Sequence, residues 1–86
     1  MTFYGVENMK KAIAYVLIKA EPGHEHEVYY SLAKREIFME IHPVVGEYSV
    51  VAKVVADDLD RIGYIVLAEM GKTEFVDSYE TLMATA

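Results

Sequence analysis

The stretch AIAYVLIKA, residues 12–20, is apolar at every position except Lys19. Such a run of aliphatic, β-branched and aromatic residues predicts a strand. Successive side chains of a strand point to opposite faces. One face carries Ile13, Tyr15 and Leu17, and the other carries Ala14, Val16 and Ile18. An antiparallel sheet with one face in water alternates apolar and polar residues, so this strand predicts a sheet that is covered on both faces.

A turn and a helix are predicted directly after this strand. The turn is EPG at residues 21–23, where proline disfavours helix at the residue before it and glycine permits the change of direction. The helix is predicted over residues 24–35. Its apolar stripe consists of Val28, Leu32 and the side of Tyr29.

A hairpin is predicted to follow the helix. Its first strand covers residues 37–45, in which Pro43 marks an edge position or a bulge because proline cannot donate to a ladder. Gly46 and Glu47 are predicted to turn the chain into the second strand, residues 48–56. That strand also has apolar side chains on both faces, and the alternation predicts that the side chains of residues 48 and 49 point to opposite faces.

A second helix is predicted to begin with Asp57 as N-cap and to stop at Gly71. Its apolar positions at helical spacing are Leu59, Ile62, Val66 and Met70. Gly63 among them predicts a close approach of this helix to the sheet. Residues 74–84 are predicted as the last strand.

The predicted order is βαββαβ. Right-handed crossovers bring both helices to one face of a four-stranded antiparallel sheet, which is the ferredoxin-like α+β arrangement. Two helices cover one face only, so we expect the other apolar face to pack against the sheet of a second subunit. Subunits would then dimerise sheet to sheet.

Composition limits the classes of protein that this chain can represent. Its 86 residues make one domain, predicted over residues 12–86 after an N-terminal extension of residues 1–11. A domain this small has a marginal core, and 53% hydrophobic residues without any cysteine favour stabilisation by oligomerisation. The net charge of −6 and the scattered basic residues argue against direct nucleic-acid binding. The absence of a long apolar run or signal-peptide pattern predicts a cytoplasmic protein without membrane contact.

The chain shows no motif for catalysis, for a metal or for a cofactor, so we expect none of the three. His24 and His26 in the run GHEHE are two residues apart, a spacing that does not place them on one helix face as joint metal ligands. They are predicted to lie in a solvated first helical turn. His42 has no neighbouring base or nucleophile pattern and is predicted to be a hydrogen-bonded surface histidine.

Three segments together resemble the effector-binding domain of the Lrp/AsnC (feast/famine) transcriptional regulators. They are EPGHEHEVYYSLAKR (21–35), PVVGEYSVVAKVVADD (43–58) and YETLMA (79–84). The resemblance covers about residues 12–85. It implies a ferredoxin-like fold that dimerises sheet to sheet, dimers that assemble into octameric or similar rings, and small effectors, typically amino acids, bound at subunit interfaces beside the hairpin.

The resemblance also implies the ligand-binding residues. Gly46 corresponds to the family's hairpin glycine, Tyr48 to its aromatic residue and Thr81 to the threonine of its closing strand. Tyr79 stands at the partner position of the family's T-x-T motif. Ser49 stands where the family usually has an aspartate, whose carboxylate would suit an ammonium group.

The resulting hypothesis is a non-catalytic, oligomerising module that binds an amino acid or similar molecule. Lacking a DNA-binding domain of its own, it would modulate a helix-turn-helix-bearing paralogue. One alternative is a small dimeric α/β-barrel enzyme of monooxygenase or isomerase type, using His42, Tyr48 and Tyr79. Another is an ACT-like regulatory domain that binds its ligand at residues 21–24. A deep apolar pocket inside the subunit would favour the enzyme, and a polar cleft between subunits at Gly46 would favour the effector module.

Overall fold

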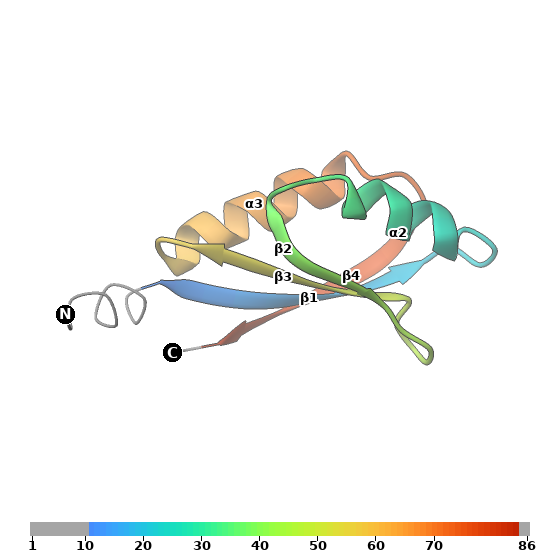
Figure 1. Ribbon diagram of the computed structural model, residues 1–86, viewed down its shortest axis with the longest axis horizontal. Coiled ribbons are helices and arrows are strands. Elements are labelled where there is room, and N and C mark those ends of the chain that lie inside the picture. The colour runs from blue at the N-terminus through green and yellow to red at the C-terminus, as the bar shows by residue number, and fades with distance from the viewer. Residues whose placement is uncertain (1–10, 85–86) are drawn as a thin grey trace.

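The structure, a computed structural model, describes residues 11–84 and has the order βαββαβ (Figure 1). Its strands are β1 (Ala12–Ala20), β2 (Phe38–Pro43), β3 (Val50–Ala56) and β4 (Val76–Ala84), and its helices are α2 (Glu25–Ala33) and α3 (Leu59–Gly71). The sheet order is β2-β3-β1-β4, and neighbouring strands are antiparallel. Both helices lie on one face of the sheet. This is the predicted ferredoxin-like α+β fold, and the bounds of β1 are those predicted. Apart from Lys11, the predicted N-terminal extension lies outside the described residues.

The connection between β2 and β3 is longer than the predicted two-residue turn. Both strands are shorter than predicted, and a hydrogen bond from the Val44 N–H to the Ser49 carbonyl (2.9 Å) leaves residues 45–48 to form the turn. The register pairs Pro43 with Val50, which keeps Gly46 and Glu47 at the centre of the turn, as predicted. Gly46 has φ +142°, a conformation that glycine adopts at low cost. The prediction was wrong only in extending both strands too close to the turn.

Pro43 ends β2, which is an edge strand as predicted. The irregularity in the β2–β3 register lies at the other end of β2, between Phe38 and Glu40. The proline therefore marks an edge position and not the bulge.

Helix α3 begins one residue later than predicted. Asp58 is its N-cap, with extended backbone and a side-chain oxygen that accepts a hydrogen bond from the Arg61 N–H (2.7 Å). Asp57 instead pairs with Lys11 at 2.8 Å, and that hydrogen bond and charge lower the pKa of Asp57. β3 ends at Ala56 as predicted, and Asp57 alone carries the chain from the sheet to the cap.

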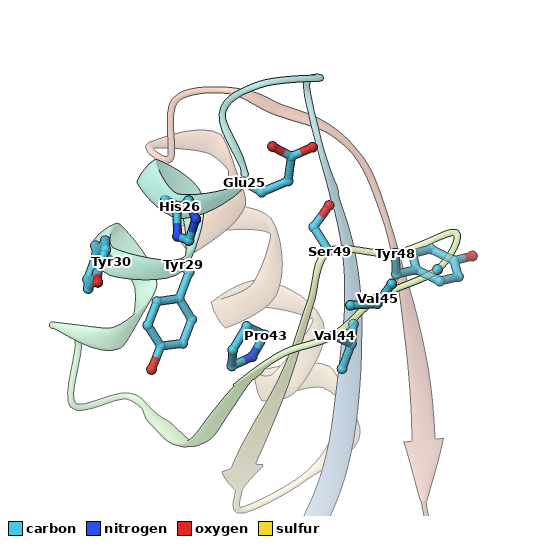
Figure 2. A pocket seen from close by; sticks show the side chains of 10 residues that line it. Glu25, His26, Tyr29, Tyr30, Pro43, Val44, Val45, Tyr48 and Ser49 are labelled. Atoms are coloured by element: carbon cyan, nitrogen blue, oxygen red, sulfur yellow. The ribbon is translucent and has the colours of Figure 1, made fainter.

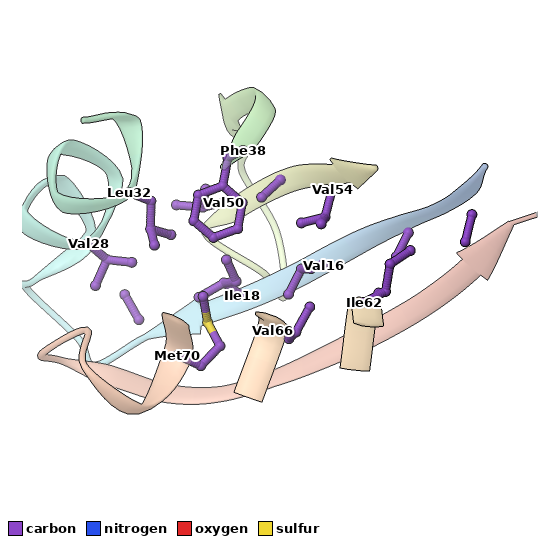
Figure 3. Packing of buried hydrophobic residues seen from close by; sticks show 14 residues of the cluster. Val16, Ile18, Val28, Leu32, Phe38, Val50, Val54, Ile62, Val66 and Met70 are labelled. Carbon is purple, nitrogen blue, oxygen red and sulfur yellow. The ribbon is translucent and has the colours of Figure 1, made fainter. Parts of the chain in front are cut away.

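The core lies between the helices and the covered face of the sheet (Figure 3). The helices contribute Val28 and Leu32 from α2 and Ile62, Val66 and Met70 from α3. The central strands contribute Ala14, Val16, Ile18, Val50, Ala52 and Val54, all fully buried. Leu59, grouped with this stripe by its spacing, is 47% exposed at the start of α3. Gly63 is also exposed, and a Cβ there would meet nothing within 4 Å, so the predicted close approach of helix to sheet was wrong.

The opposite face of the sheet, here called the open face, carries no helix. Most of its central positions are nevertheless apolar, and the exceptions among them are Lys53, which pairs with Tyr15, and Glu80, which pairs with Leu17. The apolar positions are Ile13, Tyr15 and Leu17 on β1, Val51 and Val55 on β3, and Leu82 on β4. Tyr15 pairs with Leu82 and Leu17 pairs with Val51, so these side chains are neighbours across the strands. The two-sided apolar pattern predicted from the sequence is present.

A polar clamp joins the C-terminal ends of the two helices. The Arg35 guanidinium donates to the Glu69 carboxylate (3.1 Å), to the Glu69 carbonyl (3.0 Å) and to the hydroxyl of Thr73 (2.8 Å). Arg35 also donates to Ser31 at 3.2 Å. These bonds satisfy carbonyl and hydroxyl groups at the end of α3 and fix it against α2.

Neither helix of residues 11–84 combines the length and the hydropathy that a membrane crossing would require.

Candidate functional site

A hollow of about 550 Å³ lies between the first two turns of α2 and the β2–β3 hairpin (Figure 2). Helix α2 lines it with Glu25, His26, Tyr29 and Tyr30, and the hairpin lines it with residues 43–46, 48 and 49. Its size is within the range of small-molecule sites, and its lining combines apolar side chains with a few polar groups. We call it the hairpin hollow.

The turn before α2 determines how the helix meets the hairpin. Gly23 has φ +88°, a conformation that glycine adopts at low cost. The Glu21 N–H donates to the Phe75 carbonyl (2.8 Å), which fixes the turn to the segment leading into β4. His24 follows, with its ring stacked on Phe75 at 3.8 Å between centroids and its Nδ1 hydrogen-bonded to Glu27. The first turn of α2 is therefore anchored on its far side and presents Glu25 to the hollow.

Ser49 is tied into the sheet by three hydrogen bonds. Its N–H donates to the Ile18 carbonyl (2.8 Å), its carbonyl accepts from Val44, and its hydroxyl oxygen accepts from the Ala20 N–H (3.2 Å). The hydroxyl thus satisfies a backbone donor at the end of β1. Its own proton is left to donate, and Figure 2 shows the hydroxyl directed toward the end of the hollow where Glu25 lies.

Tyr48 reaches the open face of the sheet. Its hydroxyl donates to the Glu80 carboxylate at 2.8 Å, and Glu80 pairs with Leu17 on the open face. This hydrogen bond to a carboxylate raises the pKa of Tyr48, because losing the proton would leave two negative groups in contact. Tyr48 precedes β3 and lies in the turn, where the alternation of a strand does not decide the direction of a side chain.

Tyr79 and Thr81 do not lie at the hairpin hollow. They pair with Ile18 and Val16, two residues of the covered face, and so belong to the helix side of β4. Tyr79 lines a separate hollow with residues of α3, including Leu67. Of the five predicted site residues, Gly46, Tyr48 and Ser49 lie together, while these two stand apart on the β4 edge strand.

The sequence prediction missed the contribution of α2. Three residues of α2 line the hollow although they lie well before the hairpin in the sequence, namely Glu25, Tyr29 and Tyr30. The sequence pattern predicts only a solvated first turn and a packing role for the side of Tyr29. The adjacent tyrosines carried a weak signal. Tyr30 is 60% exposed, more than a packing role explains, and its ring meets that of Tyr29 edge to face at 5.3 Å.

The residues required by the enzyme alternative do not meet. His42 lies on the open face with its ring nitrogen 3.1 Å from Glu40, and Tyr79 lies on the helix side of β4. The hydrogen bond from His42, followed by the contact with Lys53, lowers the pKa of Glu40. Within residues 11–84, no three histidine or acidic side chains are grouped as a metal site would need. The turn at residues 21–23 does not line the hairpin hollow.

Comparison with known proteins identifies the family of this fold. Residues 13–86 match the family model described as Lrp/AsnC ligand binding domain. TTHA0845 from Thermus thermophilus is 27% identical, with 87% of this chain and 94% of that chain covered and a TM-score of 0.77. The hypothetical protein PHS023 from Pyrococcus horikoshii is 25% identical over 87% of this chain and 90% of that chain, with a TM-score of 0.76.

A more distant structure shares the fold alone. It is the transcriptional regulator NMB0573 from Neisseria meningitidis in complex with L-Met, 12% identical over the whole of this chain and 56% of that chain, with a TM-score of 0.74. Among curated proteins, no significant match to this chain exists. The match of the family model to nearly all of the sequence decides the assignment: this chain belongs to the Lrp/AsnC ligand-binding domain family.

Proposed function

We propose that this chain is a non-catalytic, oligomerising module that binds an amino acid or a similar small molecule at the hairpin hollow and modulates transcription regulators. The observation that carries the proposal is the hollow itself. Gly46, Tyr48 and Ser49, the hairpin residues implied by the family resemblance, line it together with the first turns of α2. As a modulator of transcription, the protein would act in the cytoplasm.

Assembly of subunits would complete the site. The open face exposes Tyr15 and Leu82 by 39% and 47%, and a second sheet packed on this face would bury them. Tyr79 and Thr81 would then contribute to a ligand site from a neighbouring subunit of a larger ring, which accounts for their distance from the hairpin of their own chain. A ligand held across such an interface stabilises the assembled state by its differential affinity.

Regulation would be indirect. The net charge of −6 disfavours contact with DNA, and residues 11–84 contain no helix-turn-helix unit. Mixed assembly with a helix-turn-helix-bearing paralogue would transmit the ligand signal. The complex of NMB0573 with L-Met supports the general proposal, because it is an amino-acid complex of a transcriptional regulator that shares this fold.

The first test is a thermal-shift panel of the twenty amino acids on the purified oligomer. A ligand at about 100 times its dissociation constant adds roughly 2.7 kcal/mol to the free energy of unfolding. In a domain of this size that raises the melting temperature by about 10 °C or more. If the oligomer is intact and none of the twenty amino acids raises its melting temperature, amino-acid binding is removed from the proposal.

Variants then locate the site. Gly46→Ala is expected to weaken binding, because φ +142° is strained for any residue with a Cβ even though nothing lies within 4 Å of that position. Gly71→Ala is the matched control, since Gly71 also has open space around its Cβ position but no positive φ. If both variants lose the ligand-induced rise in melting temperature, or if both keep it, the hairpin at Gly46 is not the ligand site.

A further inference from the structure

The hairpin hollow carries one formal charge among its lining side chains, and that charge is negative. Glu25 supplies it, and neither lysine nor arginine is among the described residues that line the hollow. Within residues 11–84, the Glu25 carboxylate has no hydrogen-bond or ion-pair partner, whereas the next acid on α2, Glu27, is bonded to His24. An unpaired carboxylate at a concave site is available to a ligand cation.

The rest of the lining divides the hollow into two ends. Figure 2 shows Glu25 and the hydroxyl of Ser49 at one end, with the ring of Tyr29 and with Pro43 below them. The Ser49 oxygen already accepts from the Ala20 N–H, so this hydroxyl can only add a neutral hydrogen bond. The rest of the lining is apolar and aromatic except for His26, whose ring lies beside that of Tyr30. Tyrosine rings attract cations through their faces and also pack against aliphatic groups.

We infer that the hairpin hollow selects its ligand by an ammonium group bound to Glu25 and by an apolar tail, and that the ligand's carboxylate contributes little. The ligand class is therefore apolar primary amines together with amino acids that have apolar side chains. The inference rests on the proposed function, because it assumes that the hollow is the ligand site. The net charge of −6 acts in the same direction, since it attracts cations and repels anions.

Two sets of three compounds test the inference, each differing by one functional group. The first set is leucine, 3-methylbutylamine, which lacks the carboxylate, and 4-methylpentanoate, which lacks the ammonium group. The second is phenylalanine, 2-phenylethylamine and 3-phenylpropionate. Titration calorimetry on the wild-type oligomer should give dissociation constants for amine and amino acid that agree within about tenfold. The matching acid should bind at least about tenfold more weakly, as expected for loss of a charge-assisted hydrogen bond.

Glu25→Gln keeps the shape of the side chain and removes its charge. It is expected to weaken binding of the amines and of the two amino acids by about tenfold. Glu36→Gln is the matched control, because Glu36 is also exposed and is not part of the lining. Equal affinities of wild type and Glu25→Gln would overturn the role of Glu25. Size-exclusion chromatography with light scattering would check that both variants keep the assembly.

The outcomes separate this inference from the proposed function. Binding of the acids without the amines would overturn the inference and leave a small-molecule site in place. Binding restricted to amino acids with charged or amide side chains would also overturn it. If none of the six compounds binds and the panel of amino acids causes no shift, the proposed function fails and the inference fails with it.

Discussion

The two faces of the sheet are built from the same strands and differ in what covers them. On the covered face, Val16 and Ile18 are fully buried under α2 and α3. On the open face, Tyr15 and Leu82 are exposed by 39% and 47%, and Leu17 is partly exposed. The two faces are similarly apolar along β1, so side-chain chemistry does not explain the difference in burial. An apolar face of this kind is typical of a surface that another protein covers.

The hairpin hollow lies at one end of the sheet, and Tyr48 connects it to the open face. Residues 43–46, 48 and 49 form one wall of the hollow, and Tyr48 extends from that wall to Glu80 on β4. A subunit that covers the open face would therefore come close to a ligand bound in the hollow. This proximity is the physical basis on which assembly and ligand binding would influence each other.

The largest effect is expected on the covered face. Ile18→Ala removes a fully buried side chain and should lower the free energy of unfolding by about 3 kcal/mol, through lost burial and the cavity left behind. Chemical denaturation measures this loss. Leu17→Ala, one residue away on the open face, is the matched variant. The comparison is made at low protein concentration, where the subunits are dissociated. If Ile18→Ala and Leu17→Ala then lower the free energy of unfolding equally, the contrast between the two faces is contradicted.

A smaller effect on folding but a clear effect on assembly is expected for Leu17→Lys. An added charge on the open face should weaken sheet-to-sheet association by about a hundredfold, because its ammonium group would lose water on association and the carboxylate across from it, Glu80, is already hydrogen-bonded to Tyr48. The folded subunit should tolerate the change, since Lys19 already projects from the same face of β1. Light scattering as a function of concentration measures the association.

The control for this variant is Tyr64→Lys on α3, where the native side chain is 74% exposed and far from the open face. It adds the same charge and should leave the mass of the assembly, measured by light scattering, unchanged. A wild-type protein that is monomeric at high concentration would remove the proposed role of the open face.

The smallest effect concerns the bond between Tyr48 and Glu80. The pKa of Tyr48 is raised in the folded state, so its contribution to stability is present below the ordinary tyrosine pKa of about 10 and is lost as pH rises through the raised value. The difference between the ultraviolet titrations of wild type and Tyr48→Phe isolates this group from the other tyrosines. Glu80→Gln should return the pKa of Tyr48 toward the ordinary value for tyrosine. An unchanged titration in Glu80→Gln would show that another group causes the shift.

Much of the fold follows from local pattern. The strand at residues 12–20, the order of elements and the stripes of Val28, Leu32, Ile62 and Val66 could all be predicted, because period and turn chemistry are properties of neighbouring residues. The apolar character of both sheet faces was visible in the same way. The errors lie at the ends of elements, as with the cap at Asp58 and the strand ends on either side of Gly46, where a shift of one or two residues depends on how the chain leaves the sheet.

The periods of the strands and helices, the family pattern of the hairpin and the position of Gly46 can all be predicted from the sequence. Which distant side chains meet depends on tertiary packing. Packing of α2 on the sheet brings Glu25 to the hairpin, the turn carries Tyr48 across to Glu80, and the antiparallel register sends Tyr79 to the helix side of β4. Local periods fix only the direction of a side chain within its own element. Its partners depend on how elements that are far apart in the chain pack together.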